Sequence, residues 1–274
     1  MPRGSSSVVL ITGCSNGGIG FYLCEAFAER GCAVYATARR MEAMAGFVHP
    51  EIRKLVLDVN DEENIKKVVD TIIEREGRID ILISNAGIQS AGPILDMEIE
   101  RAKEAFDTNY FAVIRMAKEV VPYMATRKQG LVINVGSISS DIPTPFMGNY
   151  SASKAAVHNI SELLAMECRP LGVKVMLLQG GTVATNIDKN AENTYVMPEN
   201  SLYRQYLSRI LNRNWVTDGA MSGQEFAKRV VKKVLVRNPP AYLKVGGKVA
   251  LMNLLLWLPR QLALWIVWKI ASGR

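Results

Sequence analysis

The stretch Val8-Val-Leu-Ile-Thr-Gly-Cys-Ser-Asn-Gly-Gly-Ile-Gly20 decides the fold of this 274-residue chain. Its first four residues are an apolar run typical of a short buried strand, and a glycine-rich turn follows at once. A helical pattern then covers residues 21–30, and a second apolar strand covers residues 33–38. This order is the context of a dinucleotide-binding turn, in which glycines let the backbone approach a pyrophosphate at a helix N-terminus. We predict a nucleotide site here, and a plain turn is the alternative.

Strand-like and helical runs alternate along most of the remaining chain. Strands are predicted over 53–57, 79–84, 131–135 and 173–178, and helices over 61–75, 99–126 and 152–171. Such alternation predicts an α/β fold with a single doubly wound parallel sheet, a Rossmann fold, and helices on both faces. Ligands bind beyond the carboxyl ends of the strands in these sheets. Gly13, Asn85, Ser137 and Gly180 each lie just after a predicted strand.

A tyrosine and a lysine lie four residues apart in Asn149-Tyr-Ser-Ala-Ser-Lys154, where a helix is expected to begin. Residues i and i+4 share one face of a helix, so the Tyr150 phenol and the Lys154 ammonium would point into the same cavity. A phenol has a reference pKa of about 10, and a nearby cation lowers that pKa toward the range useful for proton transfer. The pair predicts an acid–base site, with an ordinary helix face as the alternative.

Together these residues resemble the short-chain dehydrogenase/reductase family over about residues 7–245. Its landmarks occur in the family's order, and they are the glycine-rich turn, Asp58, Asn85-Ala-Gly87, Asn109, Ser137, Tyr150 and Lys154. The chain departs from the family pattern at two places. One extra residue precedes Gly18-Ile-Gly20, and Gly180-Gly181 replaces the family's Pro-Gly, which removes a rigid proline beside the nicotinamide pocket.

The resemblance implies a catalytic tetrad of Asn109, Ser137, Tyr150 and Lys154. In this tetrad Tyr150 donates a proton to a carbonyl oxygen, and Ser137 forms a hydrogen bond to that oxygen and orients it. Lys154 lowers the pKa of Tyr150 and holds the nicotinamide ribose. Asn109 fixes a water that relays protons to Lys154. Asparagine is unfavourable in a helix interior, so its place in the predicted helix 99–126 is compatible with a local kink.

The cofactor is predicted from the resemblance and from the charge that follows the second strand. The resemblance implies cofactor contacts at Gly13, Gly18, Ile19, Gly20, Asp58, Asn85, Tyr150, Lys154, Val183 and Thr185. An acid after the second strand would hold the ribose 2′-hydroxyl of NAD, whereas an arginine accommodates the 2′-phosphate of NADP. Here Ala38 occupies the acid's position, and Arg39 and Arg40 follow it. A guanidinium binds two phosphate oxygens at once. We predict NADP(H), and solvated surface arginines are the alternative.

The chain is expected to form a catalytic domain over residues 1–245, with a substrate loop at about 182–223, and a basic apolar tail over residues 246–274. The apolar members of the loop favour a lipid-like or aromatic substrate, or else they cover the core. They are Ile187, Tyr195, Met197, Leu202, Tyr206, Leu207 and Trp215.

The C-terminal region has an unusual charge and apolar pattern. Residues 226–274 contain ten Lys or Arg and no Asp or Glu, whereas residues 1–225 carry a net charge of −3. Two apolar stretches, 249–258 and 262–268, flank Pro259-Arg-Gln261, and both are shorter than the roughly 20 residues of a membrane span. The tail tryptophans with their flanking Lys248, Arg260 and Lys269 fit an interfacial anchor on anionic lipid. A helix packed over the substrate cleft or in a dimer interface is the alternative.

The cysteine and histidine residues bear on metal binding and on the cellular compartment. The cysteines (Cys14, Cys24, Cys32 and Cys168) lack metal-type spacing and the two histidines, His49 and His158, stand alone, so we predict no metal site. We expect reduced thiols, no signal peptide, and a location at the cytoplasmic face of the endoplasmic reticulum or a lipid droplet. A redox role for Cys14 is an alternative. No nucleic-acid partner is expected, and the resemblance implies a small carbonyl substrate and a homodimer or homotetramer.

The sequence thus predicts an NADPH-dependent oxidoreductase that transfers a hydride to a ketone or aldehyde of a lipid-like or specialised-metabolite substrate. The glycine-rich turn, the Ala36-Thr-Ala-Arg39 segment and the apolar tail resemble the fungal group similar to 1-acyldihydroxyacetone-phosphate reductases. That group also contains ketoreductases of polyketide-like compounds and hydroxysteroid-type enzymes. A catalytically silent NADP-binding scaffold or sensor is the alternative, although such a protein has no need of a proton donor.

Overall fold

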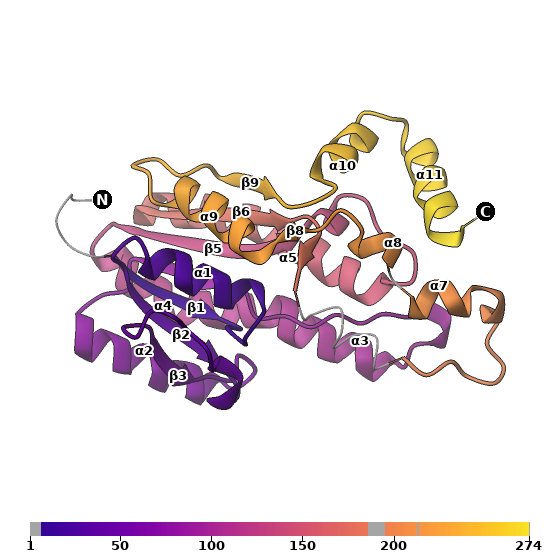
Figure 1. The fold of residues 1–274 in the computed structure, drawn as a ribbon. Coiled ribbons are helices and arrows are strands. Elements are labelled where there is room, and N and C mark those ends of the chain that lie inside the picture. The colour runs from indigo at the N-terminus through magenta and orange to yellow at the C-terminus, as the bar shows by residue number, and fades with distance from the viewer. Residues whose placement is uncertain (1–6, 186–194, 213, 274) are drawn as a thin grey trace.

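A computed structural model describes residues 7–185, 195–212 and 214–273, and its centre is a seven-stranded sheet (Figure 1). The strand order is β3-β2-β1-β4-β5-β6-β9, and all six neighbouring pairs are parallel. The strands are β1 (Val8–Thr12), β2 (Ala33–Ala38), β3 (Arg53–Val56), β4 (Ile81–Ser84), β5 (Gly130–Ser137), β6 (Val173–Gly180) and β9 (Tyr242–Val245). A short parallel pair, β7 (Val183–Ala184) and β8 (Met221–Ser222), lies outside this sheet. The predicted doubly wound parallel sheet is confirmed.

Helices cover both faces of the sheet. Their bounds are α1 (Ile19–Ala28), α2 (Glu62–Glu76), α3 (Ile99–Phe106), α4 (Ala112–Thr126), α5 (Gly148–Cys168), α7 (Leu207–Leu211), α8 (Asn214–Thr217), α9 (Gly223–Val234), α10 (Val249–Leu256) and α11 (Arg260–Ser272). Val9 and Ile11 of β1 pack in the hydrophobic cluster that includes α1 and α9, whereas Val8 and Leu10 pack in the cluster with α2 and α4. Because both faces are buried, β1 is a continuous apolar run without polar alternation.

Helix α2 illustrates how local signals set the ends of these elements. The Asp61 carboxylate accepts a hydrogen bond from the Asn64 backbone N–H at 3.0 Å and thereby caps the first turn. The helix ends at Gly77, whose φ of +72° suits a residue without Cβ. Ile65, Val69 and Ile72 lie on the face that packs against the sheet. The sequence predicted this helix over 61–75, within one residue at each end.

The helix predicted over residues 99–126 is divided into two. α3 ends at Phe106, a π-helical turn covers Asp107–Phe111, and α4 begins at Ala112. Asn109 lies in the π-helical turn, where the sequence had suggested a kink. Single π-turns inside helices are frequent at functional sites because they change the direction of the side chains that follow.

The C-terminal tail forms a helical hairpin of α10 and α11 that packs against the fold (Figure 1). Leu255, Ala263 and Val267 are buried in a small cluster with Ile142, which follows β5. The Trp268 ring lies 5.5 Å from the Tyr206 ring, centre to centre. In the part of the chain that the structure describes, no helix is both long and apolar enough to cross a membrane.

Candidate active site

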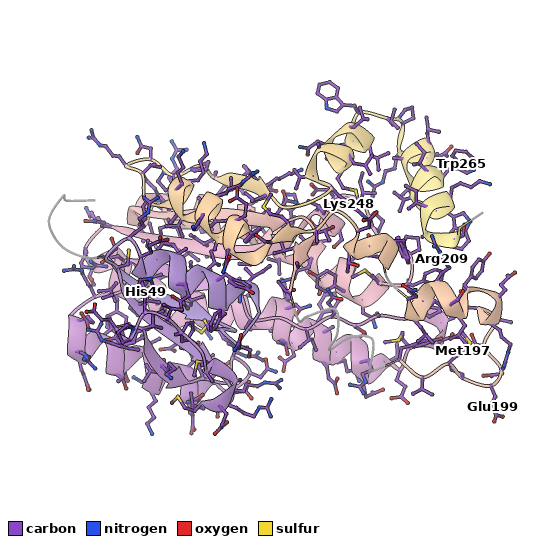
Figure 2. All side chains as sticks on the ribbon, in the orientation of Figure 1. His49, Met197, Glu199, Arg209, Lys248 and Trp265 are labelled. Carbon is purple, nitrogen blue, oxygen red and sulfur yellow. The ribbon has the colours of Figure 1, made fainter. Side chains whose placement is uncertain are left out.

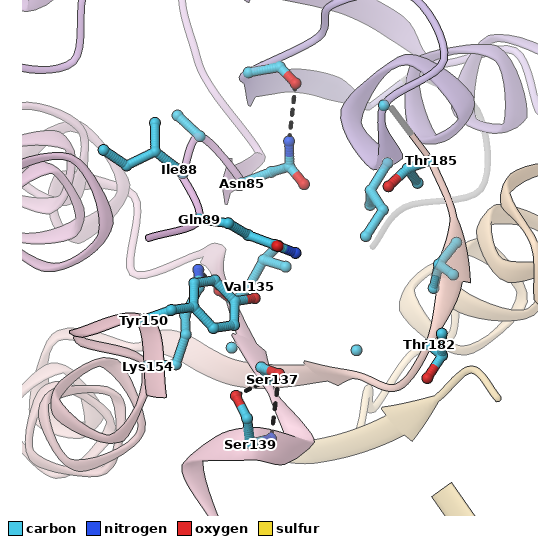
Figure 3. A pocket seen from close by; sticks show the side chains of 18 of the residues that line it. Asn85, Ile88, Gln89, Val135, Ser137, Ser139, Tyr150, Lys154, Thr182 and Thr185 are labelled. Carbon is cyan, nitrogen blue, oxygen red and sulfur yellow. Dashed lines mark hydrogen bonds between the residues drawn. The ribbon is translucent and has the colours of Figure 1, made fainter. Parts of the chain in front are cut away.

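A cavity of about 630 Å³ opens at the carboxyl ends of the central strands (Figure 3). Its wall begins at the turn after β1 and continues past the ends of β2, β4, β5 and β6 to the α10–α11 hairpin. The order of the strands reverses at β1, which pairs with β2 on one side and with β4 on the other. A cavity at this point is where open parallel sheets bind their ligands.

The glycine-rich turn forms a cradle that leaves no room for side chains. Gly13 has a φ of +72°, and a Cβ on it would lie 2.7 Å from the Ala86 Cα atom. A Cβ on Gly20 would lie 2.6 Å from the Gly13 carbonyl oxygen. Gly13, Gly18 and Ile19 line the cavity, whereas Gly20 lets α1 approach the turn closely. This backbone cradle fits a pyrophosphate, because exposed N–H groups and a helix N-terminus attract anions.

The extra residue in the turn is accommodated through Asn16. The Asn16 backbone N–H donates to the Ala43 carbonyl at 2.7 Å, and its side-chain amide donates to the Ala45 carbonyl at 3.1 Å. These bonds attach the longer turn to the segment that follows β2. The departure from the family pattern therefore leaves Gly18 and Ile19 at the cavity wall.

Asn85 fixes the turn to the end of β4. Its side-chain amide donates to the carbonyl oxygens of Thr12 and Gly13 at 2.8 and 3.0 Å. In return, the Thr12 hydroxyl accepts hydrogen bonds from the backbone N–H groups of Asn85 and Ala86, both at 3.0 Å. Asn85 thus shapes the cradle and also lines the cavity.

The predicted cofactor-selecting residues lie at one end of the cavity. Ala38 is buried, and Arg39 and Arg40 are exposed and line the wall. Asp58 lines the same end, where its carboxylate accepts a hydrogen bond from the Asn60 backbone N–H at 3.0 Å. Two guanidinium groups follow β2, and no carboxylate occupies the position before them. This arrangement suits a nucleotide whose ribose carries a 2′-phosphate.

Ser137, Tyr150 and Lys154 come together in the middle of the cavity (Figure 3). Ser137 is the last residue of β5, and the other two lie in the first two turns of α5. The Lys154 ammonium lies 5.9 Å from the centre of the Tyr150 ring and donates to the Val135 carbonyl at 2.8 Å. The Ser137 hydroxyl accepts hydrogen bonds from the Ser139 backbone N–H at 3.2 Å and the Ser139 hydroxyl at 2.9 Å.

Burial lowers the pKa of Lys154 from 10.5 to about 8. At pH values between about 8 and 10.5, the Lys154 side chain is protonated in the unfolded chain and deprotonated in the folded chain. The free energy of unfolding therefore rises with pH over this range. Relative to a Lys154→Met variant, wild type should gain roughly 2–3 kcal/mol of stability as the pH rises across this interval. Denaturant unfolding of both proteins without cofactor measures this difference. A difference that stays constant across the interval would show that the Lys154 ammonium is well solvated.

Asn109 lies behind the cavity wall rather than in it. Its side-chain oxygen accepts from the Ile88 N–H at 2.7 Å, and its amide donates to the Ile88 carbonyl at 3.0 Å and to the Ser153 hydroxyl at 2.9 Å. Ser153 in turn donates to the Tyr150 carbonyl at 2.8 Å. The buried amide therefore connects the loop after β4 to the first turn of α5, which carries Tyr150.

The segment after β6 lines the cavity with Gly180, Gly181, Val183 and Thr185. β6 continues through Gly180, which pairs with Ser137 in the sheet. A Cβ on Gly181 would lie 2.3 Å from the Gly247 carbonyl oxygen. The close contact between Gly181 and the start of the tail thus holds this segment, where the family pattern has a proline one residue earlier.

The apolar residues predicted in the substrate loop lie in different surroundings. Of the seven apolar loop residues, Ile187 lies outside the described residues, and Trp215 lines the cavity. Tyr195, Met197 and Tyr206 pack together in a separate cluster, and Leu202 is 78% exposed, so most of these side chains do not form the apolar lining of the cavity. The tail supplies that lining instead, through Leu251, Met252, Leu255, Val267 and Ile270.

A charged cluster beneath Ser137 is absent from the sequence prediction. The Asp141 carboxylate accepts hydrogen bonds from Gln179 at 2.9 Å and Lys244 at 2.7 Å, and it lies 3.2 Å from the His158 Nδ1 atom. Burial raises the pKa of Asp141, but the hydrogen bonds from Lys244 and Gln179 outweigh burial, so this pKa lies below its usual value. The His158 ring contacts Asp141 and also Glu162, the latter at 3.3 Å, so carboxylates satisfy both of its nitrogen atoms.

The buried thiols lie away from the cavity wall. Cys14 is fully buried, its thiol donates to the Ile11 carbonyl at 3.2 Å, and the Cys24 thiol contacts it at 3.4 Å. Among the described residues, no group of three or more His, Cys, Asp or Glu side chains has an arrangement that could hold a metal ion.

A glycine cradle at the point of strand reversal, with a serine, a tyrosine and a lysine around one cavity, defines a class of dinucleotide-dependent oxidoreductases. These enzymes act on carbonyl or hydroxyl groups. The chain belongs to the short-chain dehydrogenase/reductase family, whose short chain dehydrogenase domain matches residues 7–196.

Several known proteins are similar over most of the chain. A protein of Schizosaccharomyces pombe named NADPH-dependent 1-acyldihydroxyacetone phosphate reductase is 36% identical over 84% of this chain and 78% of its own length. A 3-ketodihydrosphingosine reductase of Bacteroides thetaiotaomicron is 34% identical over 89% of this chain and 90% of its own length. The crystal structure of a short chain dehydrogenase from Burkholderia cenocepacia in complex with NADP is 25% identical, covers 96% of this chain and 97% of its own, and has a TM-score of 0.75.

Proposed function

We propose that the protein is an NADPH-dependent reductase of a ketone or aldehyde group on a substrate with an acyl or other long apolar chain. The observation that carries this proposal is the arrangement of one cavity with three parts. In the order of the sheet, two arginines lie at one end after β2, the serine, tyrosine and lysine lie in the middle beside β5, and an apolar wall of tail residues lies at the other end after β9. Each part fits one part of the reaction: the cofactor's phosphate, the reacting carbonyl, and the substrate's apolar chain.

Arg39 and Arg40 are the basis for preferring NADPH. Their guanidinium groups would bind the 2′-phosphate, and the glycine cradle after β1 would hold the pyrophosphate. The S. pombe relative is named NADPH-dependent, and the B. cenocepacia relative was solved with NADP. Bound NADPH would supply the hydride for the carbonyl carbon. Val183 and Thr185, at the cavity wall after β6, are proposed to contact the nicotinamide carboxamide.

Tyr150 is proposed as the acid that protonates the substrate oxygen. Negative charge develops on this oxygen during reduction, and a positioned proton donor stabilises it. The Ser137 hydroxyl already accepts two hydrogen bonds from Ser139, so its own proton is directed toward another acceptor, such as the substrate oxygen. The Lys154 ammonium, 5.9 Å from the Tyr150 ring centre, would favour the phenolate that remains after proton transfer.

Asn109 is proposed to act through the groups that it holds. Its bonds to Ile88 and Ser153 keep the loop after β4 and the start of α5 in register. A Cβ on Gly87 would lie 3.0 Å from the Asn109 side-chain oxygen and 3.5 Å from the Lys154 Nζ atom, so this glycine is closely packed between them. The relay water that the family resemblance implies would lie on this side of Lys154.

The tail lining is the basis for the proposed substrate class. Leu251, Met252, Leu255, Val267 and Ile270 present apolar atoms beyond the reacting centre. An apolar chain of the substrate would be buried here at about 25 cal/mol per Å² of buried surface. The two relatives are named for reductions of acyl dihydroxyacetone phosphate and ketodihydrosphingosine. Both names describe ketones of lipid type, one with an acyl group and one with a sphingosine skeleton.

The proposal is tested by following NADPH oxidation with a panel of ketones. The panel contains 1-acyldihydroxyacetone phosphate, 3-ketodihydrosphingosine, a steroid ketone, a polyketide-like ketone and a short soluble ketone, with NADH as the comparison cofactor. We expect the highest kcat/KM for a ketone with a long apolar chain and with NADPH. Tight NADPH binding without turnover of any carbonyl would favour a silent scaffold or sensor. A preference for the short ketone over its long-chain counterpart would overturn the proposed substrate class.

A further inference from the structure

The hairpin of α10 and α11 has an inner and an outer face. Its inner face packs on the fold through Leu255, Ala263 and Val267. On its outer face Trp257 is 88% exposed, Leu254 is 63% exposed and Trp265 is 56% exposed. Figure 2 shows Trp265 on the side of α11 that faces away from the sheet. Large apolar side chains exposed on one short helical hairpin are typical of an interaction site.

The charged side chains of the tail itself have one sign. Arg260 and Lys269 are exposed on α11, and residues 226–274 contain no acidic side chain. The Lys269 ammonium lies 5.4 Å from the Trp265 ring centre, which places a cation beside an exposed indole. Tryptophan with flanking lysine and arginine is the composition of segments that lie in the headgroup region of a bilayer.

A second copy of the chain fits this surface less well than an anionic bilayer. A symmetric dimer through the hairpin would place the same surface on both sides of the contact. Its basic residues would then meet basic residues, and the tail has no carboxylate to pair with them. An anionic bilayer supplies the opposite charge, and each basic residue near its surface contributes about 1 kcal/mol. Charge complementarity therefore favours the bilayer.

The same hairpin forms the rim of the cavity. Leu251 of α10 and Ile270 of α11 line the cavity and are still 41% and 43% exposed. They therefore lie where the cavity wall meets the outer surface. The rim of the substrate end and the exposed apolar surface belong to the same two helices.

We propose that the outer face of the α10–α11 hairpin rests on an anionic bilayer surface, and that the substrate's apolar chain enters the cavity from this bilayer past Leu251 and Ile270. The second part rests on the proposed reduction of a long-chain ketone. The first part is independent of it, because it depends only on the exposed side chains and the charge. Neither helix crosses the bilayer in this arrangement, in agreement with their lengths.

The test compares full-length wild type with a Leu254→Gln/Trp257→Gln double variant. Both positions are exposed and lie outside the cavity wall, so basal activity on a short soluble ketone should be unchanged. A Val48→Gln/Leu202→Gln variant is the matched control, because these residues are 84% and 78% exposed but lie outside the tail. Each protein is sedimented with vesicles of phosphatidylcholine alone or with about one-fifth phosphatidylserine.

We expect wild type and the control to bind the phosphatidylserine vesicles, and the tail variant to bind them at least about tenfold more weakly. The tail variant should also lose about tenfold in kcat/KM for a long-chain ketone carried in these vesicles, but not for the same ketone in detergent micelles. Equal binding of wild type and tail variant, or a dimer that only the tail variant disrupts, would overturn the bilayer contact.

Two further outcomes separate this proposal from the proposed function. If vesicle binding depends on Leu254 and Trp257 but no ketone is reduced under any condition, the bilayer contact stands and delivery to the cavity is overturned together with the reductase activity. If the long-chain ketone is reduced in micelles but wild type does not bind vesicles, the reductase activity stands and the bilayer proposal is overturned.

Discussion

Replacement of Tyr150 by phenylalanine is expected to lower kcat by about 10²- to 10⁴-fold, the range that a positioned acid contributes. Phenylalanine keeps the ring that lines the cavity and removes only the hydroxyl. The Ser153 hydroxyl bonds to the Tyr150 backbone carbonyl, and this contact is retained in the variant. The melting temperature and the Kd for NADPH should therefore change little. Steady-state kinetics with the best ketone of the panel and a thermal melt give the two readouts.

The matched control is Tyr123→Phe on α4, whose hydroxyl contacts Asp70 at 3.3 Å outside the cavity. This variant should retain wild-type kcat. If Tyr150→Phe also keeps kcat within a few-fold of wild type, Tyr150 is not the acid. If it loses NADPH binding as strongly as turnover, the hydroxyl serves the cofactor site rather than proton transfer.

Replacement of Arg39 and Arg40 by alanine is expected to weaken NADPH binding by about ten- to a hundredfold and to leave NADH binding nearly unchanged. A hydrogen bond to a charged group contributes about 1.5–3 kcal/mol, and about 1.4 kcal/mol corresponds to a tenfold change in Kd. Both side chains are exposed, so salt screens part of this interaction and the lower end applies at high ionic strength. The Kd for each cofactor, measured by fluorescence titration at two salt concentrations, checks the prediction.

An Arg101→Ala variant is the control for loss of a surface arginine. Arg101 lies on α3, pairs with Glu104 at 3.1 Å, and is not part of the cavity wall. It should leave both cofactor affinities unchanged. Equal weakening of NADPH and NADH in the double variant would assign Arg39 and Arg40 to the structure of the β2 terminus and would contradict the NADPH preference.

The parts of the fold that the sequence predicted well are those in which the signal is local. β2 was predicted at its observed bounds, and α1 within two residues, because each is an apolar run next to a glycine turn. β9 was missed. Its sequence, Tyr242-Leu-Lys-Val245, is short and has a lysine inside it, and it forms a strand only because β6 offers a free edge. Such pairing depends on a contact between residues far apart in the sequence.

The candidate site also has parts that the sequence predicted and parts that it did not. Ser137, Tyr150 and Lys154 were found because their spacing is read along one chain segment, and the structure brings them to one cavity. The Asp141 cluster was missed because its members come from four different elements and no motif relates them. Whether the tail packs over the cleft was left open by the sequence. α10 is apolar nearly all round, so its periodicity does not tell which side faces the cavity.

The position of the tail has a consequence for the divergence of related proteins. The residues proposed to hold the cofactor all lie at or before Thr185, whereas the apolar end of the cavity is built by α10 and α11. Substitutions in α10 and α11 would change which substrates fit the cavity. The catalytic residues, and with them the reaction, would stay the same. Two contacts limit that freedom: Arg260 donates to the Asp141 carbonyl at 2.7 Å, and Gly247 lies against Gly181. Duplicated copies would therefore acquire new substrates through changes in α10 and α11, provided that both contacts are kept.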